Sequence, residues 1–458
     1  MTPMWTIAEV ARALGIAGSF PDTPIDFVTQ DSRLVKPGSL FVALSGTPSG
    51  GFISSFASAR DGWEFADKAE AAGAAAMIVP HAIEGIRVPQ LIVKDTLIDG
   101  LWALARAARA RFEGPVIGLT GSAGKTSTKE FLAAYPNAFA SPASFNNFWG
   151  VPLTLCNAKP DASLWVVEIG MNQSGEILRL SELTRPTVAL VVNVQPVHLE
   201  MLGSLEAIRQ EKVSIARGLP EDGVLVLPVG IAAPEWGGKV VRFGEGAEVR
   251  ELARAPQGES WLETAQVGAE QIEFSLTPGA PHRVQNALGA LASLYAAGLD
   301  AAALAARLDR VGIMSGRGVE QAIGGITVID DSFNGNPASM AAALEGLKAR
   351  HMTTGRRIAV LGDMLELGSE APAHHKDLAR HLPGIDGIYC VGPLMHHLYG
   401  LLPDGKGLGW HEDPATLDPR DVAALLKQGD VVVVKGSKKM FWVNKFVPRL
   451  VAALQADA

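Results

Sequence analysis

Residues 115–132 read PVIGLTGSAGKTSTKEFL, and this stretch decides what kind of fold must surround it. An apolar run that ends at Leu119 turns through Gly121 and Gly124 into a segment of helix-forming residues. Glycines in such a turn let backbone N–H groups point inward around phosphate oxygens, and the helix that follows offers its positive end. A buried strand, a phosphate-binding turn and a helix in succession predict a nucleotide-binding α/β sheet.

The same stretch carries side chains that suit ATP. Lys125 would place a positive charge at the β- and γ-phosphates, and the Thr126 hydroxyl is a ligand for Mg²⁺. The strict phosphate-loop pattern has a glycine where this chain has Leu119, so the prediction rests on the physics of the turn. A glycine-rich turn with a surface lysine is the alternative. The predicted ATP-binding residues are Thr120, Gly121, Ser122, Ala123, Gly124, Lys125, Thr126 and Ser127.

Strand-like and helical segments alternate on both sides of this turn. LWVVEIG and TVALVVNV are continuous apolar runs, typical of parallel strands buried on both faces. After a boundary near residues 310–317, the runs ITVIDD, RRIAVLGD, GIYCVG and DVVVVKGS repeat the rhythm. The pattern predicts an α/β protein with doubly wound sheets and with ligands at the C-terminal ends of the strands. For 458 residues we expect three domains, 1–110, 111–312 and 313–458.

Composition excludes several classes of protein. The net charge is -8 and no dense Lys/Arg block occurs, which argues against a nucleic-acid binder. Two cysteines exclude a disulfide framework and a cysteine-rich zinc site. The longest uncharged stretch, Leu132 to Ala158, contains three prolines and four asparagines, so we expect no membrane insertion. Without a secretory signal at the start, we expect a cytoplasmic protein.

Two strand ends near the phosphate turn carry groups that suit a second cation. Glu168 ends one apolar run and His198 follows the next, so both would lie at the edge of the sheet that holds the turn. Each also has a simpler interpretation, as a solvated carboxylate and an ordinary histidine. Lys212 falls in a helical segment, where a lysine is more often a solvated residue.

The last third of the chain has three polar turns after three apolar runs. DDSFNGNP occupies residues 330–337, GDMLELG occupies 362–368 and KGSKK occupies 435–439. The carboxylates and amides of the first turn would cap the following helix, or bind ribose and a substrate ammonium. Because three successive strand ends carry such turns, we expect them to converge on one crevice.

These motifs together resemble the Mur ligase family over nearly the whole chain. TGSAGKTST, SFNNFWGVPLTL, VVEIGMNQSGEI and NVQPVHLEMLGSLEAIRQEK are similar to successive motifs of its central domain. HRVQNALGA and GRGVE resemble its ATP-binding and hinge segments. DDSFNGNPASM and LGDMLELG resemble the branch of the family that adds a D-alanyl-D-alanine dipeptide. The resemblance implies an N-terminal UDP-substrate domain, a central ATPase sheet and a C-terminal Rossmann-like ligase domain.

The resemblance also implies roles for individual residues. It implies that Lys125, Lys212, Arg317 and His198 are catalytic, with Lys212 at a position where several relatives carry a carbamylated lysine. It implies the metal ligands Thr126, Glu168, His198 and Lys212. Beyond the phosphate turn, the implied nucleotide contacts are His282, Asn286, Arg317 and Asp331. The implied substrate contacts are Asp31, Ser32, Arg33, Gly46, Asn146, Asn147, Asn334 and Asn336.

Two positions depart from the family pattern. Asp61-Gly62-Trp63 stands where Asp-Gly-His is common, after an apparent Gly/Ser-rich insertion, and Phe333 replaces a common tyrosine. The first departure bears on the uridine side of the pocket. The second removes a hydroxyl group from the segment that precedes a predicted helix.

The activity implied is ATP-dependent amide formation through an acyl phosphate. The substrates would be ATP, a UDP-N-acetylmuramoyl-tripeptide and D-alanyl-D-alanine, with Mg²⁺ as cofactor and a monomeric enzyme. The third residue of the tripeptide, meso-diaminopimelate or lysine, stays open. Another ligase of the superfamily, such as a folylpolyglutamate or amino-acid-adding enzyme, is one alternative. A regulatory nucleotide-binding module that turns over ATP without an amide product is another.

Overall fold

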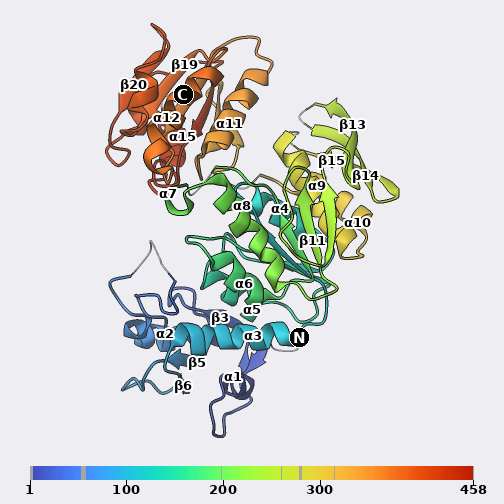
Figure 1. Cartoon of the computed structure of the whole chain (residues 1–458). Helices are drawn as coiled ribbons and strands as arrows, with labels where there is room; N and C mark the ends of the chain where they lie inside the picture. The colour runs from blue at the N-terminus through green and yellow to red at the C-terminus, as the bar shows by residue number, and fades with distance from the viewer. Residues whose placement is uncertain are drawn as a thin grey trace. The chain divides into compact units, whose positions relative to one another are not determined.

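The computed structural model describes residues 4–52, 58–196, 199–258, 260–277, 281–313 and 315–456. The chain divides into two compact units. The first comprises Met1–Val194 and Arg209–Val311, and the second comprises Gln195–Ile208 and Gly312–Ala458. Within the described residues, no helix is long and apolar enough to cross a membrane. The predicted α/β class is confirmed, because parallel strands and helices alternate in both units (Figure 1).

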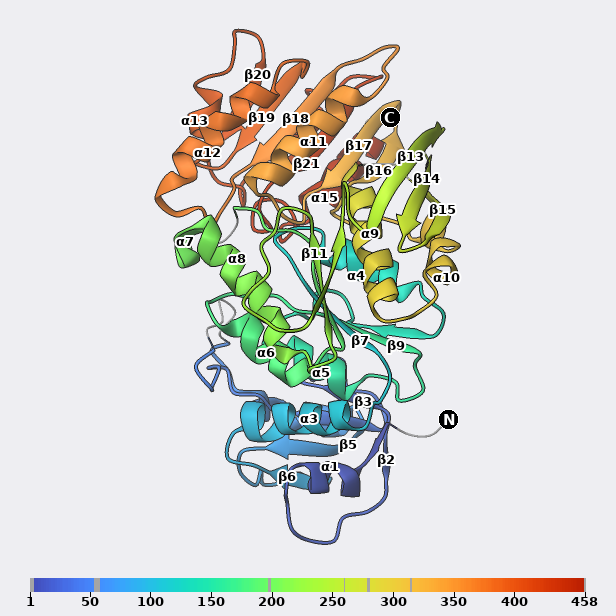
Figure 2. The same cartoon turned by 45° about the vertical axis from the view of Figure 1, so that its right-hand side comes forward.

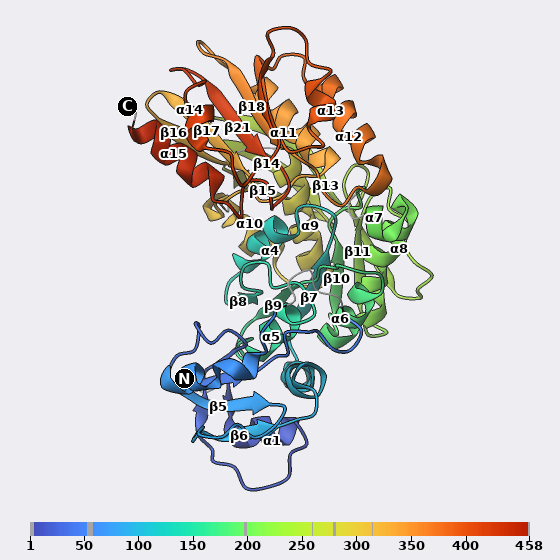
Figure 3. The same cartoon turned by 90° about the vertical axis from the view of Figure 1, so that its left-hand side faces the viewer.

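The first unit begins with a small parallel sheet in the order β3-β4-β5-β6. The strand β5 is Ala-rich and almost entirely buried, and it lies next to β6 (Figure 3). The helix α3 lies between this sheet and the helices α5 and α6 (Figure 2). A capping box formed by Thr6 and Glu9 starts α1. The elements are β1 (Trp5–Thr6), α1 (Ile7–Ala13), β2 (Pro24–Ile25), β3 (Phe27–Thr29), β4 (Ser39–Val42), η1 (Gly62–Phe65), α2 (Ala66–Ala71), β5 (Ala74–Val79), β6 (Gln90–Ile92), η2 (Thr96–Trp102) and α3 (Ala103–Ala110).

A nine-stranded sheet forms the rest of the first unit, in the order β15-β14-β13-β12-β11-β10-β7-β9-β8 (Figure 2). The strands from β8 to β13 are parallel, and β13, β14 and β15 are joined antiparallel. The predicted runs LWVVEIG and TVALVVNV form β9 and β10 on either side of β7. The antiparallel strands β13 to β15 were not predicted, because their alternating, half-exposed sequence lacks an apolar run.

The bounds of these strands and of their helices are as follows. The strands are β7 (Val116–Thr120), β8 (Ala138–Ala140), β9 (Leu164–Glu168), β10 (Val188–Val191), β11 (Val224–Pro228), β12 (Lys239–Phe243), β13 (Val249–Gln257), β14 (Ser260–Val267) and β15 (Glu270–Leu276). The helices are α4 (Lys125–Ala133), α5 (Gly150–Cys156), α6 (Glu176–Thr184), α8 (Leu205–Val213), η3 (Ser214–Gly218), α9 (Pro281–Ala296), α10 (Ala301–Ala305) and η4 (Leu308–Arg310).

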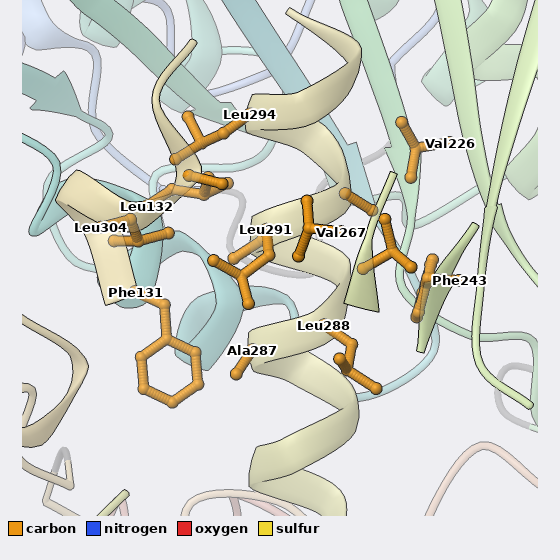
Figure 4. Packing of buried hydrophobic residues seen from close by; sticks show 14 of the residues in the cluster. Phe131, Leu132, Val226, Phe243, Val267, Ala287, Leu288, Leu291, Leu294 and Leu304 are labelled. Carbon is orange, nitrogen blue, oxygen red and sulfur yellow. The ribbon is translucent and has the colours of Figure 1, made fainter. Parts of the chain in front are cut away.

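The core of this sheet is built around α9, which is buried along most of its length. Leu288, Leu291 and Leu294 of α9 face apolar side chains from the sheet strands and from α4 and α10 (Figure 4). Phe131 and Leu132, at the end of α4, belong to the same cluster. Burying side chains of this size contributes about 1.5–3 kcal/mol each. The helix that starts at the phosphate turn is therefore fixed by the core, and the turn is fixed with it.

The second unit contains one six-stranded sheet in the order β16-β17-β21-β18-β19-β20. All its strand pairs are parallel except the β16–β17 hairpin. The predicted runs form β17, β18, β19 and β21. The elements are α7 (Leu199–Leu202), β16 (Val319–Ile323), β17 (Ile326–Asp331), α11 (Pro337–Ala349), β18 (Arg357–Gly362), η5 (Gly368–Glu370), α12 (Ala371–Asp377), η6 (Leu378–His381), β19 (Gly387–Val391), α13 (His396–Tyr399), β20 (Gly407–His411), α14 (Pro419–Ala423), β21 (Val431–Lys435) and α15 (Phe446–Ala456).

Candidate active site

The phosphate turn lies between β7 and α4, as predicted. Gly124 has a φ of 75° and precedes the first residue of α4, Lys125. This left-handed φ favours glycine, and a Cβ at position 124 would lie 2.4 Å from Oδ1 of Asn286, so the Asn286 side chain would also have to move. The Nζ of Lys125 donates to the carbonyl oxygen of Gly121 at 2.6 Å. The lysine is thus folded over the turn, where it can exchange a carbonyl partner for a phosphate.

Asn193, which sequence reasoning did not single out, holds the turn from the next strand. Its side chain accepts a hydrogen bond from the N–H of Ala123 at 2.9 Å and donates one to the Ala123 carbonyl at 3.0 Å. The Asn193 carbonyl also accepts from the N–H of Ser122 at 3.1 Å. Asn193 follows β10, which pairs in parallel with β7. The only signal in the sequence was its place as a polar residue near the end of the TVALVVNV run.

Glu168 ends β9 beside the phosphate turn, because β9 pairs with β7 and Glu168 lies opposite Leu119. The side chain is 1% exposed. Its Oε1 accepts from Nδ2 of Asn146 at 2.7 Å and lies 3.4 Å from Oγ1 of Thr126. Its Oε2 is buried and has no hydrogen-bond partner in the described part of the chain. A buried carboxylate oxygen without a partner needs a proton or a cation.

These groups fit a Mg²⁺ ion. Thr126 and Glu168 offer a hydroxyl and a carboxylate oxygen, and Mg²⁺ prefers one or two such ligands together with water and substrate phosphates. The described residues contain no cluster of three or more His, Cys, Asp or Glu side chains able to hold an ion. The hydroxyl of Thr126 and the carboxylate of Glu168 suit a hard cation shared with a nucleotide rather than a closed zinc site. His198, the other expected ligand, lies outside the described residues.

Lys212 is buried, and the interpretation of this residue as a solvated lysine is therefore wrong. It is 1% exposed at the end of α8. Burial holds the pKa of its ammonium well below the usual range, and the charge of Lys125 lowers this pKa further. A helix whose exposed and buried faces are both rich in charged residues gives no periodic signal for this burial.

Asn146 and Asn147 lie on the loop between β8 and α5, with different tasks. Asn146 donates to Glu168, and its carbonyl accepts from the N–H of Gly170 at 2.7 Å. The Oδ1 of Asn147 accepts from the N–H of Gly150 at 2.8 Å, at the start of α5. Asn146 is therefore built into the carboxylate site, while the side-chain oxygen of Asn147 satisfies a helix terminus.

The predicted nucleotide contacts on α9 differ in burial. Asn286 is 5% exposed and packs on Gly124, so it is placed at the phosphate turn. His282 is exposed in the first turn of α9. The Oγ1 of Thr120, at the end of β7, is buried without a hydrogen-bond partner within the described ranges.

The predicted UDP-side residues follow β3 and β4 in the small sheet. Arg33 donates to Asp31 at 2.6 Å, and this guanidinium holds the pKa of Asp31 below its usual value. Ser32 lies between these two residues and is half-buried. Asp61, in the segment that departs from the family pattern, accepts from the N–H of Gly46 at 2.9 Å. A Cβ on Gly46 would lie 2.3 Å from the Ser58 carbonyl, so the loop approaches closely there.

The second unit brings three predicted polar turns to one sheet edge. Asp331 and Lys435 are paired in register on β17 and β21, and Lys435 Nζ lies 2.7 Å from Asp331 Oδ2. The same Nζ donates to the carbonyl of Asn334 at 3.1 Å. Ser437, after β21, accepts from the N–H of Leu365 at 2.8 Å. Lys435 is buried, so it fixes the DDSFNGNP turn from beneath.

Two further predicted residues of this unit have contacts of their own. Asn336 is the N-cap of α11 and shares a capping box with Ser339, which is the capping alternative raised from the sequence. The guanidinium of Arg317 lies 4.3 Å from the ring centroid of Phe333. Phe333 in turn packs edge-on against Trp442. The departure from tyrosine therefore leaves an aromatic face that holds the arginine.

Comparison with known proteins gives the same assignment along the chain. The Mur ligase middle domain matches residues 119–294, and the Mur ligase glutamate ligase domain matches residues 317–438. The UDP-N-acetylmuramoyl-tripeptide–D-alanyl-D-alanine ligase of Escherichia coli (strain K12) is 34% identical, covering 94% of this chain and 95% of its own length. The chain belongs to the Mur ligase family.

This Mur ligase is also similar in structure to solved relatives. Its TM-score with MurF from Acinetobacter baumannii is 0.81, at 27% identity over 98% of this chain and 99% of that one. Its TM-score with MurF ligase from Thermotoga maritima in complex with ADP is 0.77, at 25% identity, and the match covers 96% of this chain and 100% of that one.

Three residues of this Mur ligase were not among the predicted site residues but touch them. Asn193 holds the phosphate turn, Lys435 holds Asp331, and Lys129 holds the loop that carries Asn146. All three are polar residues whose partners are distant in sequence or lie in an irregular loop. For Lys435 the signal was the polar turn after its apolar run, which was expected to meet the turn that holds Asp331. For Asn193 and Lys129 a single sequence contains no such signal, because their partners meet them only when strands and loops pack together.

Proposed function

We propose that this Mur ligase joins D-alanyl-D-alanine to UDP-N-acetylmuramoyl-tripeptide and consumes ATP in doing so. Its product would be the UDP-linked muramoyl-pentapeptide of peptidoglycan synthesis. The observation that carries the proposal is full-length similarity to curated ligases of this name, the Escherichia coli enzyme among them. The ADP complex of the Thermotoga maritima relative supports ATP as the phosphoryl donor.

ATP activates the substrate carboxylate in the first step. A carboxylate oxygen of the tripeptide attacks the γ-phosphorus, the bond from γ-phosphorus to the β,γ-bridging oxygen breaks, and ADP leaves. The backbone N–H groups of the turn from Gly121 to Gly124 and the ammonium of Lys125 would bind the phosphates. Mg²⁺, held through Thr126 and Glu168, would neutralise charge between the two anionic reactants. Donors placed before the reaction in this way lower the barrier without reorganising.

The second step forms the amide. The amine of D-alanyl-D-alanine attacks the acyl carbon, a tetrahedral intermediate collapses, phosphate leaves and the nitrogen loses a proton. Asn146 would hold Glu168 in position for the metal, and its neighbour Asn147 would face the muramoyl-peptide. Asp331, Asn334 and Asn336 of the second unit would contact the nucleotide or the dipeptide, with Arg317 meeting the phosphates.

Lys212 would serve this site as a carbamate. Burial and the charge of Lys125 lower the pKa of Lys212, and this favours the unprotonated amine, which is the form that takes up CO₂. The modification would give Lys212 an anionic carboxylate that could help hold the second cation together with Glu168 and His198, whereas an ammonium there would repel both Mg²⁺ and Lys125.

One assay tests the proposed function. The enzyme is incubated with UDP-MurNAc-tripeptide, D-alanyl-D-alanine, ATP and Mg²⁺, and the pentapeptide product is sought by mass, with tripeptides that contain meso-diaminopimelate or lysine. Lys125→Ala is the inactive control. Product with a single amino acid in place of the dipeptide would assign a sister ligase instead. ATP hydrolysis without any amide product would assign a nucleotide-binding module.

A further inference from the structure

Lys129 is a lysine in the core of the first unit. It lies on α4, one helical turn after Lys125, and is 1% exposed. Its Nζ donates to the carbonyl oxygens of Ser141 at 2.8 Å and Ala143 at 2.5 Å. The carboxylate of Glu130 lies 2.9 Å from the same nitrogen. The three N–H donors of an ammonium thus meet two carbonyls and one counter-ion, which is what a buried lysine requires.

The partners of Lys129 lie on the loop that begins after β8 and ends at α5. Ala143 has a φ of 46°, a left-handed conformation that is uncommon for residues other than glycine. Such a conformation costs of order 1 kcal/mol and persists only where the surroundings fix it. The hydrogen bond from Lys129 to this residue's carbonyl is a contact that can fix it.

The same loop is bonded to the carboxylate site. Ser141, whose carbonyl Lys129 binds, accepts with its Oγ from the N–H of Glu168 at 3.0 Å. Five residues further on, Asn146 donates to Oε1 of Glu168 and accepts from the N–H of Gly170. Lys129 therefore bonds one end of a loop that reaches the end of β9 through Ser141 and Asn146. The far end of the loop is held elsewhere, since the Phe148 carbonyl accepts from Nε1 of Trp102 at 2.8 Å.

We propose that Lys129 is a positioning residue that couples the helix of the phosphate turn to the loop holding Asn146 and Glu168. Through this loop it sets the orientation of the Glu168 carboxylate and of the Asn146 amide. This inference rests on the proposed function only for its kinetic consequence. The loop contacts themselves can be tested without any ligase activity.

A substitution by methionine tests the hydrogen bonds of Lys129 while it largely keeps the packing of the side chain. Lys129→Met keeps the length of the stem and removes the ammonium. The matched control is Glu130→Gln, which removes the counter-charge on the neighbouring residue and leaves both carbonyl bonds in place. If Lys129→Met does not fold, Lys129→Gln replaces it, since its amide still donates to one carbonyl and should give intermediate effects.

Hydrogen–deuterium exchange tests the structural step in the wild type and both variants. We expect the backbone amides of Ser141, of residues 143–147 and of Glu168 and Gly170 to exchange about tenfold faster in Lys129→Met, with β7 unchanged. Glu130→Gln should exchange like the wild type. Unchanged exchange of this loop in Lys129→Met, or equal acceleration throughout α4 and β7, would overturn the positioning role. Neither result depends on which reaction the enzyme catalyses.

Kinetics tests the consequence for the site. A misplacement of catalytic groups by about 1 Å costs on the order of a hundredfold in rate, so kcat in Lys129→Met should fall by tenfold to a hundredfold while the KM for ATP changes less than about threefold. Asn146→Ala, alone and combined with Lys129→Met, completes a double-mutant cycle. A double variant no worse than the poorer single variant supports action through Asn146. Independent, multiplying losses would contradict it. Failure of the proposed function would show differently, as a wild type without amide product.

Discussion

Asn193 forms two hydrogen bonds with the backbone of Ala123, one to its N–H and one to its carbonyl, across 70 residues of sequence. A side-chain amide that satisfies both groups of one peptide fixes the orientation of that residue in the turn. In the proposed function the neighbouring N–H groups point at phosphate oxygens, and this clamp, the two hydrogen bonds of Asn193, would hold the turn in the shape that this requires.

Asn193→Ala tests this clamp. Two hydrogen bonds worth about 1 kcal/mol each correspond to a loss of about thirtyfold in kcat/KM for ATP. The measurement is steady-state ligation with varied ATP, together with nucleotide binding by calorimetry. Asn157→Ala is the matched control, since Asn157 also makes side-chain bonds to backbone but joins α5 to β3. A similar loss of ATP affinity in both variants would show that the effect is general loosening.

Arg317→Ala should reduce turnover much more than nucleotide affinity. A phosphate-directed donor that acts in the transition state contributes about 3 kcal/mol, or about a hundredfold in kcat. Phe333→Leu removes the aromatic face under the guanidinium and should cost only severalfold, as expected for a contact of about 0.5–1 kcal/mol. Rapid-quench measurement of ligation and equilibrium binding of ADP distinguish the two quantities. Equal losses of binding and turnover in Arg317→Ala would argue against a role in the transition state.

Lys212→Ala tests the proposed carbamate. We expect the loss of most activity, followed by partial recovery when a short carboxylic acid is added, because the acid supplies the missing anion beside Glu168. Removing dissolved CO₂ from the wild-type enzyme should lower activity in the same direction. Lys129→Met serves as a comparison, since its defect should not be rescued by acids. An active Lys212→Ala enzyme, or one that no carboxylic acid rescues, refutes the hypothesis.

His375 makes the stability of the second unit depend on pH. Its ring is fully buried, with Nε2 accepting from the N–H of Met364 at 2.9 Å and Nδ1 lying 2.6 Å from the Ala371 carbonyl. Nδ1 therefore carries the single proton. Burial lowers the pKa of this histidine from its ordinary 6.5, and the neighbouring His397 and His374 also oppose its protonation.

The sign of the effect follows from which state binds the proton. Below pH 6.5 the unfolded chain binds a proton at His375 more readily than the folded chain does, so the free energy of unfolding falls as pH falls. The slope for one group is at most about 1.4 kcal/mol per pH unit. We expect His375→Gln to be less stable at pH 7.5 but to lose less stability between pH 6.5 and 5. Urea unfolding at several pH values measures this, and identical slopes for both proteins would contradict it.

The strand–turn–helix around Gly121 and Gly124, the buried parallel strands and the α/β class could be predicted from the sequence alone. Each depends on residues that are close together: glycines at 121 and 124, a lysine and a threonine after them, and continuous apolar runs such as the one that ends at Glu168. Local backbone preferences and burial patterns act over a few residues, so they are visible in a single sequence. The resemblance to Mur ligases came from these same short motifs.

Tertiary structure alone decided which polar residues touch. The strand order places β7 between β9 and β10, although β7 is the first of these three strands in the sequence. This order brings Asn193 to Ala123 and Glu168 to Thr126. Lysine is a residue type that usually lies on the surface, and only the packing of their helices buries Lys129 and Lys212. The sequence left two interpretations of Asn336, a helix cap or a ligand-binding residue. Only the structure shows that Asn336 forms a capping box with Ser339. Long-range contacts like these depend on the summed packing of the whole unit, and for that reason no local pattern contains them.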